Sequence, residues 1–289
     1  PTDRPGVESG FKTHSQTIAA NTTVEVSGDT SVVTALNSLT QNNGQLRVIN
    51  GATISPSGTV NTAGALEVGG TLNSFVVVQN GGSLSGNGTV GGNVTAQSGG
   101  TIAPGPGPYI APGTGVLRTA TTLLNGGSTY TWELNSWTAS PGAGGNYDQL
   151  RGTSGAKLNL AGATSGNKIT LRVTSLTAGN TLGLTPLFDN TVSRSWTIAD
   201  YADGNGSGGI QNFSADKFAL DTSGFANEID STNFSLSLDA NSNRIILTYT
   251  PVPEPAAVLL VAAGGAYSGG LARRLWLRRK GTAGKPAAI

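Results

Sequence analysis

A glycine-centred phrase recurs along the first half of the chain and constrains its fold more than any other feature. Each copy is a glycine turn, then Ser, Thr or Asn, then a β-branched or aliphatic residue. Copies lie at residues 51–54, 69–72, 81–84, 91–94 and 99–102. Their spacing is irregular, roughly 8 to 18 residues, and short segments with alternating apolar residues lie between them. The phrase therefore predicts many short strands separated by tight turns.

Burial of apolar surface decides how such strands combine. One strand-turn unit cannot bury its own apolar face, whereas stacked units bury a continuous column of Val, Ile and Leu. Residues 24–130 are therefore predicted to form a parallel β-helix or solenoid. An irregular antiparallel sandwich is the alternative, because short strands bounded by glycine permit it as well.

Composition supports an all-β chain. Glycine supplies 43 of the 289 residues, only 11% are charged, and strong helix formers are scarce. Residues 1–23 lack the repeated phrase, and we expect this N-terminal segment to be partly disordered.

The pattern changes over residues 131–250, where the strands become longer and more aromatic, as at residues 168–173 and 244–249. This region is predicted to be a β-rich C-terminal cap, either sandwich-like or a continuation of the stack, because an uncovered last coil exposes an apolar face and an unpaired edge. Four phenylalanines are predicted to lie in its core, with a carbohydrate-stacking platform as the alternative. They are Phe213, Phe218, Phe225 and Phe234.

The last 39 residues, 251–289, have a different character. An uncharged apolar run extends from residue 256, and with Leu275, Trp276 and Leu277 it is long enough to be a single transmembrane helix over residues 256–277. Basic residues flank its far end in the tail of residues 273–289: Arg273, Arg274, Arg278, Arg279 and Lys280. Basic flanks stay in the cytoplasm, so everything before residue 251 is expected outside it. A buried C-terminal helix is the alternative.

The segment before this run carries a second signal, Val252, Pro253, Glu254 and Pro255. Its prolines cannot donate backbone hydrogen bonds and hold the preceding residues extended. Motif, span and basic tail together resemble the PEP-CTERM sorting signal of Gram-negative bacteria. The resemblance implies an exosortase-type processing enzyme that cuts near the motif and delivers the protein to the cell surface or to an extracellular polysaccharide matrix, as in a biofilm.

Part of the repeat region is similar to the autotransporter-associated β-strand repeat proteins. The matching segments are residues 84–94, 99–105 and 126–134. The resemblance implies a β-solenoid rather than an activity. An autotransporter also needs a C-terminal membrane barrel, and this chain has no room for one.

The charge and the sulfur content of the chain limit which binding partners and metal sites are expected. The chain has no cysteine, which excludes disulfides and thiolate metal sites, and no methionine, so we expect an export signal to precede Pro1. Residues 1–250 carry eleven basic and fifteen acidic residues, a net charge of about −4. Nucleic acid is therefore not an expected partner.

Catalytic groups are sparse. The single histidine is His14, and Glu67 is the only acid between Thr30 and Trp132. Hydrolysis of polysaccharides needs paired carboxylates, and the later aspartates are scattered as in turns. They include Asp148, Asp189, Asp200, Asp216, Asp221, Asp230 and Asp239. The sequence predicts a protein that is not an enzyme and has no cofactor.

One segment resembles the start of a calcium loop, with oxygen ligands at alternate positions, Asp203, Asn205 and Ser207. The twelfth position is Ser214 rather than a bidentate glutamate. A glycine-rich loop without metal is the favoured interpretation, and the three residues remain a weak candidate site.

The sequence thus predicts a non-enzymatic structural protein, anchored briefly in the inner membrane and then released to the surface or matrix. The alternative is an adhesin or glycan-binding module, in which exposed Asn, Thr and Ser ladders or Trp137, Tyr147 and Tyr201 contact sugar. An unrecognised hydrolase is a third possibility. End-to-end association into a homo-oligomer or filament is a fourth.

Overall fold

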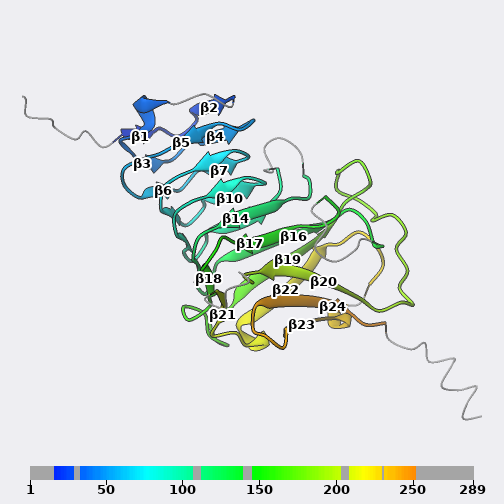
Figure 1. Cartoon of the computed structure of the whole chain (residues 1–289). Coiled ribbons are helices and arrows are strands. Elements are labelled where there is room, and N and C mark those ends of the chain that lie inside the picture. Colours follow the sequence, from blue (N-terminus) through cyan, green and yellow to red (C-terminus); the bar gives the residue numbers. More distant parts are fainter. Residues whose placement is uncertain are drawn as a thin grey trace, which may run out of the picture. The chain divides into compact units, whose positions relative to one another are not determined.

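The computed structural model describes residues 16–28, 33–106, 112–138, 145–202, 208–229 and 231–251. Within these residues the chain is all-β and contains no α-helix (Figure 1). Three short 3-10 helices interrupt it: η1 (Thr34–Leu36), η2 (Ala215–Lys217) and η3 (Ser231–Asn233). The chain divides into two compact units, Pro1–Thr250 and Pro251–Ile289, and every strand belongs to the first.

The strands of this first unit form three eight-stranded sheets, named A, B and C. Sheet A contains β1 (Gln16–Ile18), β3 (Leu39–Asn42), β6 (Val60–Thr62), β9 (Val76–Val78), β12 (Val94–Ala96), β15 (Thr122–Leu124), β18 (Lys157–Asn159) and β21 (Gly209–Gln211). Sheet B contains β2 (Thr23–Ser27), β4 (Gln45–Ile49), β7 (Ala65–Val68), β10 (Ser83–Gly86), β13 (Thr101–Pro104), β16 (Thr129–Leu134), β19 (Ile169–Ser175) and β22 (Phe218–Gly224). Sheet C contains β5 (Thr53–Ile54), β8 (Thr71–Leu72), β11 (Thr89–Val90), β14 (Val116–Thr119), β17 (Gln149–Gly152), β20 (Arg194–Asp200), β24 (Arg244–Tyr249) and β23 (Phe234–Leu238).

From β3 to β22 the chain visits sheets A, B and C in turn, and each such circuit is called a coil. A strand pairs in parallel with the strand of the same sheet in the next coil, so that Leu46, Leu66 and Leu84 follow one another in register. Figure 1 shows these strands stacked from β1 and β2 to β21 and β22. Stacked parallel sheets of this kind are compatible with a β-helix or solenoid. Parallel pairing contradicts the antiparallel sandwich considered from the sequence.

Coil length explains the irregular spacing of the glycine phrase. Leu66 pairs with Leu84 and Leu84 with Ile102, a step of 18 residues, and each coil contains more than one copy of the phrase because it turns more than once. Equivalent turns stack: the Gly81 N–H donates to the Gly99 carbonyl at 3.0 Å, and the Gly99 N–H to Gly127 at 2.8 Å. These three glycines have φ of +78°, +78° and +79°. L-residues with a side chain rarely adopt this conformation, which is why the turns use glycine.

The core changes along the stack. In the early coils it is a ladder of buried aliphatic side chains, whereas in the late coils large aromatic rings fill it. The Trp137 ring lies 4.6 Å from Phe188, 5.0 Å from Trp196 and 5.1 Å from Tyr249, measured between ring centroids.

The predicted core positions of the phenylalanines are confirmed. Phe218, Phe225 and Phe234 are buried, and Phe213 is partly buried against the same core. The expectation that Trp137, Tyr147 and Tyr201 contact sugar is wrong, because these side chains are at most 1% exposed. They pack inward because the longer late coils enclose more volume than aliphatic side chains fill.

Sheets A and B continue through residue 130 without a break, so the later residues extend the stack. Sheet C ends differently. Strand β24 pairs antiparallel with β20, and β23 pairs antiparallel with β24. This hairpin covers the edge of β20 that faces away from β17. Among the described residues no helix has the length and apolarity needed to cross a membrane, and the predicted span lies outside them.

Candidate functional surfaces

Many residues singled out from the sequence lie outside the described residues. These are the motif Val252, Pro253, Glu254 and Pro255; the basic residues Arg273, Arg274, Arg278, Arg279 and Lys280; the loop residues Asp203, Asn205 and Ser207; His14; and Asp230. Their roles stay predictions. Among the described residues, the candidate surfaces are the outer faces of sheets B and C and a hollow lined by residues of the β19–β20 connection.

Outward side chains on sheet B form a column of alternating charge, called here the sheet B charge column. On the first three strands Glu25, Arg47 and Glu67 lie in register. Arg47 binds both neighbours: its Nε donates to Glu67 Oε2 at 2.8 Å, and its Nη1 contacts Glu25. The hydrogen bond to Glu67 raises the pKa of Arg47. Glu67, the isolated acid of the repeat region, is therefore an ion-pair partner between strands.

The last two strands of sheet B complete this column. Arg172 and Asp221 lie in register, and Arg172 Nε contacts Asp221 Oδ2 at 3.1 Å. Between the two charged groups the outward residues are small, and a groove of about 290 Å³ results. Its lining includes Ser83, Thr101, Ala103, Thr131, Glu133 and Arg172. The groove combines hydroxyl, carboxyl and guanidinium groups with apolar surface from Ala103 and Pro104, a combination that suits hydroxyl-bearing ligands.

Two carboxyl groups lie close together here, and one of them, Glu133, lines the groove. Asp148 is fully buried; its Oδ1 accepts the Gly115 N–H at 2.8 Å and its Oδ2 accepts the Glu133 N–H at 3.0 Å. The Glu133 side chain accepts the Gly113 N–H at 3.0 Å. Asp148 thereby ties together three backbone segments that are distant in sequence.

Burial controls the protonation of both groups. It raises the pKa of Glu133 to about 7, because the charged form loses water. Burial, and then the nearby charge of Glu133, raises the pKa of Asp148 well above its usual range. Glu133 is the one carboxyl of the pair that lines the groove, where it can donate or accept a proton near neutral pH. Asp148 has no contact with solvent, so its role is structural.

The sequence interpretation of the aspartates is accordingly mixed. Asp189 and Asp239 accept nearby backbone N–H groups in turns, from Thr191 and Asn243 respectively. Asp200 and Asp221 instead lie within strands β20 and β22, and Asp216 lies in η2. Asp148 was expected to be such a turn residue and is instead wholly buried. A sequence signal exists for it, since it lies within two residues of Tyr147 and Leu150, both core side chains.

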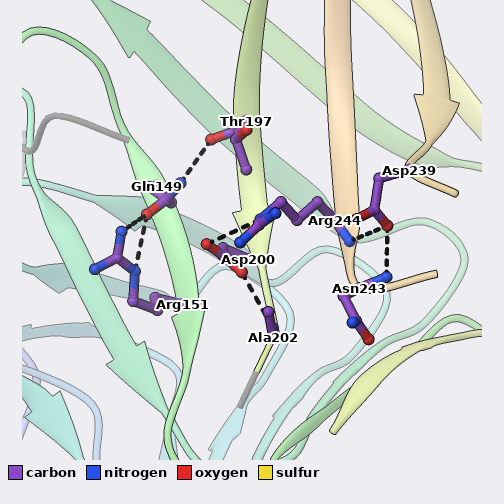
Figure 2. Close-up of polar contacts among 8 residues, drawn as sticks. All are labelled: Gln149, Arg151, Thr197, Asp200, Ala202, Asp239, Asn243 and Arg244. Carbon is purple, nitrogen blue, oxygen red and sulfur yellow. Dashed lines mark hydrogen bonds and ion pairs between the residues drawn. The ribbon is translucent and has the colours of Figure 1, made fainter. Parts of the chain in front are cut away.

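Outward residues of sheet C form a second column, called here the sheet C arginine column. Arg118, Arg151, Asp200 and Arg244 lie in register on β14, β17, β20 and β24. Arg244 Nε contacts Asp200 Oδ2 at 3.3 Å, and the Arg244 N–H donates to Asp239 Oδ1 at 2.9 Å. Figure 2 shows these contacts on one side of Asp200 and the Arg151 group on the other.

Arg151 is held by an amide rather than a carboxylate. Its Nε donates to Gln149 Oε1 at 2.9 Å, and the Gln149 amide in turn donates to the Thr197 carbonyl at 2.9 Å (Figure 2). Gln149 is only 2% exposed. A nearly buried side chain thus fixes the Arg151 guanidinium at the surface.

Residues of the connection between β19 and β20, together with Thr138, Asn227 and Glu228, line a hollow of about 680 Å³. Leu184 and Leu187 on its rim are 62% and 70% exposed, and Leu187 has a left-handed φ of +59°, which is strained for a leucine. Charges of both signs, Asp189, Arg194 and Glu228, also line it. The hollow therefore selects no single ligand class by charge.

Within the described residues no cluster of three or more potential metal-ligating side chains occurs. Comparisons of the chain with protein-family models, curated proteins and solved structures gave no match.

Proposed function

We propose that this protein is a non-enzymatic structural component of the cell surface or extracellular matrix, exported and sorted through its C-terminal segment. The observation that carries the proposal is where the folded body ends. The last strand, β24, ends at Tyr249 and the first compact unit at Thr250. Cleavage at Val252 to Pro255 would remove none of the described strands and leave every described sheet intact.

The finer architecture belongs to the same proposal. The stacked sheets form a β-solenoid whose late, aromatic coils and β23–β24 hairpin serve as the cap, and residues 256–277 form a transmembrane helix that is a transient anchor. Arg273, Arg274, Arg278, Arg279 and Lys280 orient this helix with its end in the cytoplasm. An exosortase-type enzyme is the processing partner. No cofactor takes part.

Mass spectrometry of the C-terminus tests the sorting step in the cells that naturally produce the protein. The wild-type protein should be recovered outside the cells and end near Pro253. A variant with Pro253, Glu254 and Pro255 changed to Ala should keep its tail and remain with the membrane fraction. Pro251→Ala, just outside the motif, is the matched control and should be processed normally. An intact tail on both wild type and variant would refute processing at this site.

A glycan-binding module is the second candidate, favoured by the polar groove on sheet B and by in-register threonines on sheet C. Thr53, Thr71 and Thr89 face outward one above another, each partly exposed. Their hydroxyls can hydrogen-bond to sugar hydroxyls along the stack. Binding of the recovered protein to a glycan array would favour this role, and matrix localisation without binding would favour the structural one.

A further inference from the structure

The sheet C arginine column places two like charges side by side. Arg118 and Arg151 occupy paired positions on adjacent parallel strands, on the same outward face. Neighbouring strands lie about 4.8 Å apart, and like charges placed opposite each other destabilise a sheet. In the sheet B charge column, by contrast, Arg47 and Arg172 each lie beside a carboxylate.

No carboxylate in the described part of the chain forms an ion pair with Arg118 or Arg151. Asp200 is next in the column, but its carboxylate contacts Arg244 and accepts the Ala202 N–H at 3.1 Å. Arg151 is bound to the neutral amide of Gln149, and Arg118 is exposed without an ion-pair partner among the described residues. Two positive charges therefore face solvent side by side.

Arg151 is also positioned in advance. Gln149 holds the guanidinium through two of its nitrogens, and Gln149 is itself fixed by the Thr197 carbonyl (Figure 2). A cation fixed in this way loses less conformational entropy when it binds an anion than a free surface arginine does.

The residues beside the pair indicate what kind of anion fits. On the side of Arg118, the column continues through Thr89, Thr71 and Thr53, so that hydroxyls and guanidinium groups share one line. From Thr53 to Arg151 the line covers four strand spacings, roughly 19 Å. A polymer that carries both hydroxyl and carboxylate groups matches this line along its length.

We propose that the line Thr53, Thr71, Thr89, Arg118 and Arg151 binds an acidic polysaccharide, with carboxylates on the two arginines and sugar hydroxyls on the threonines. Nucleic acid fits less well, because residues 1–250 carry a net charge of about −4 and a two-arginine site neutralises few phosphates. This inference relies on the proposed function for one point only, that the protein meets the polysaccharide outside the cell. Binding itself depends only on the folded residues before Pro251.

The test is binding of the purified full-length protein to immobilised polygalacturonate, with the uncharged polymer pullulan as the reference. Wild type should bind polygalacturonate and not pullulan, and binding should weaken as salt rises. The double variant Arg118→Ala, Arg151→Ala should lose affinity by about tenfold or more per arginine. Arg47→Ala, on the ion-paired sheet B charge column and outside its groove, is the matched control and should bind like wild type.

A double replacement by lysine distinguishes the effect of the positive charges from the effect of the guanidinium geometry. Arg118→Lys with Arg151→Lys keeps both charges but loses the two-nitrogen contact with Gln149, so it should bind with intermediate affinity. Equal binding by wild type and the alanine variant, equal binding to pullulan, or tighter binding to duplex DNA at the same salt would overturn the proposal. Each of these outcomes leaves the processing of the C-terminus untouched, so the two proposals fail separately.

Discussion

The early coils, β3 to β13, and the late coils, β16 to β24, obey one stacking rule but fill their interiors differently. Along sheet B the early coils advance by 18 to 20 residues and bury an aliphatic ladder, as at Leu46, Leu66 and Leu84. In the late coils the step from Tyr130 to Leu171 is more than twice as long, and tryptophan and tyrosine rings fill the core. The comparison teaches that strand pairing within the sheets preserves the register. The length of the connections between strands sets how large the enclosed core is.

The largest expected effect is on stability, and it compares the aromatic core of the late coils with the aliphatic core of the early coils. Trp132 is fully buried, packs against Trp196 at 5.6 Å and donates its Nε1–H to the Asp148 carbonyl at 2.7 Å. Trp132→Ala should cost about 4 kcal/mol of unfolding free energy, and Leu84→Ala in the early ladder about 3 kcal/mol. Denaturant unfolding of both variants measures the order. A larger loss for Leu84→Ala would contradict the view that the aromatic cluster is the better packed core.

The second expected effect concerns pH. The pKa of Glu133 is raised from 4.5 to about 7 in the folded protein. The folded state therefore binds more protons than the unfolded state between these values, so stability falls as pH rises from about 4.5 to 7 and levels off above it. The loss is on the order of 3 kcal/mol. Asp148 acts with the same sign.

Thermal unfolding across this pH range checks the effect, with Glu133→Gln as the variant and Glu67→Gln in the early coils as the control. Glu133→Gln should flatten the profile, since its amide does not titrate. A profile unchanged by Glu133→Gln would show that this carboxyl is not the source of the slope.

Turn glycines are the third point of comparison. A Cβ on Gly99 would lie 2.0 Å from Asn80 Oδ1, and its φ is +78°. Gly99→Ala should cost about 2 kcal/mol from strain and crowding. Gly166, in a late connection, has open space around it, and Gly166→Ala should be close to neutral. Similar losses for both, measured by chemical unfolding, would remove the distinction between stacked turns and free connections.

The smallest expected effect lies on the surface. Arg47 bridges two acids and its side chain is 20% exposed, whereas Arg172 has one partner and is 50% exposed. Arg47→Ala should cost about 1 kcal/mol, and Arg172→Ala less than about 0.5 kcal/mol. High salt should shrink both values, as unfolding midpoints at low and high salt would show.

The sequence predicts the parallel stack well in the early coils, where the glycine-centred phrase recurs and the connections are short. Glycine turns and alternating strands specify a coil locally, so Thr53, Thr71 and Thr89 align without knowledge of distant residues. Register is harder to predict once connections lengthen. Arg118 meets Arg151, and Asp148 meets Glu133, only because loops of unequal length return to the same edge.

For the same reason the burial of Trp137 and Tyr201 was not evident from the sequence. An aromatic residue in a long connection has no periodic pattern to say which way it points. The candidate sites on sheets B and C thus depend on tertiary register, and no short motif encodes them. The sorting motif is the opposite case, since its signal is wholly local.

The sheet B charge column carries an acid at each end, Glu25 on the first strand and Asp221 on the last. If one copy docked its first strand on the last strand of another, the two carboxylates would approach at the junction and repel. Solenoid ends normally invite such growth. Carboxylates at both ends of this column would therefore oppose growth by that contact.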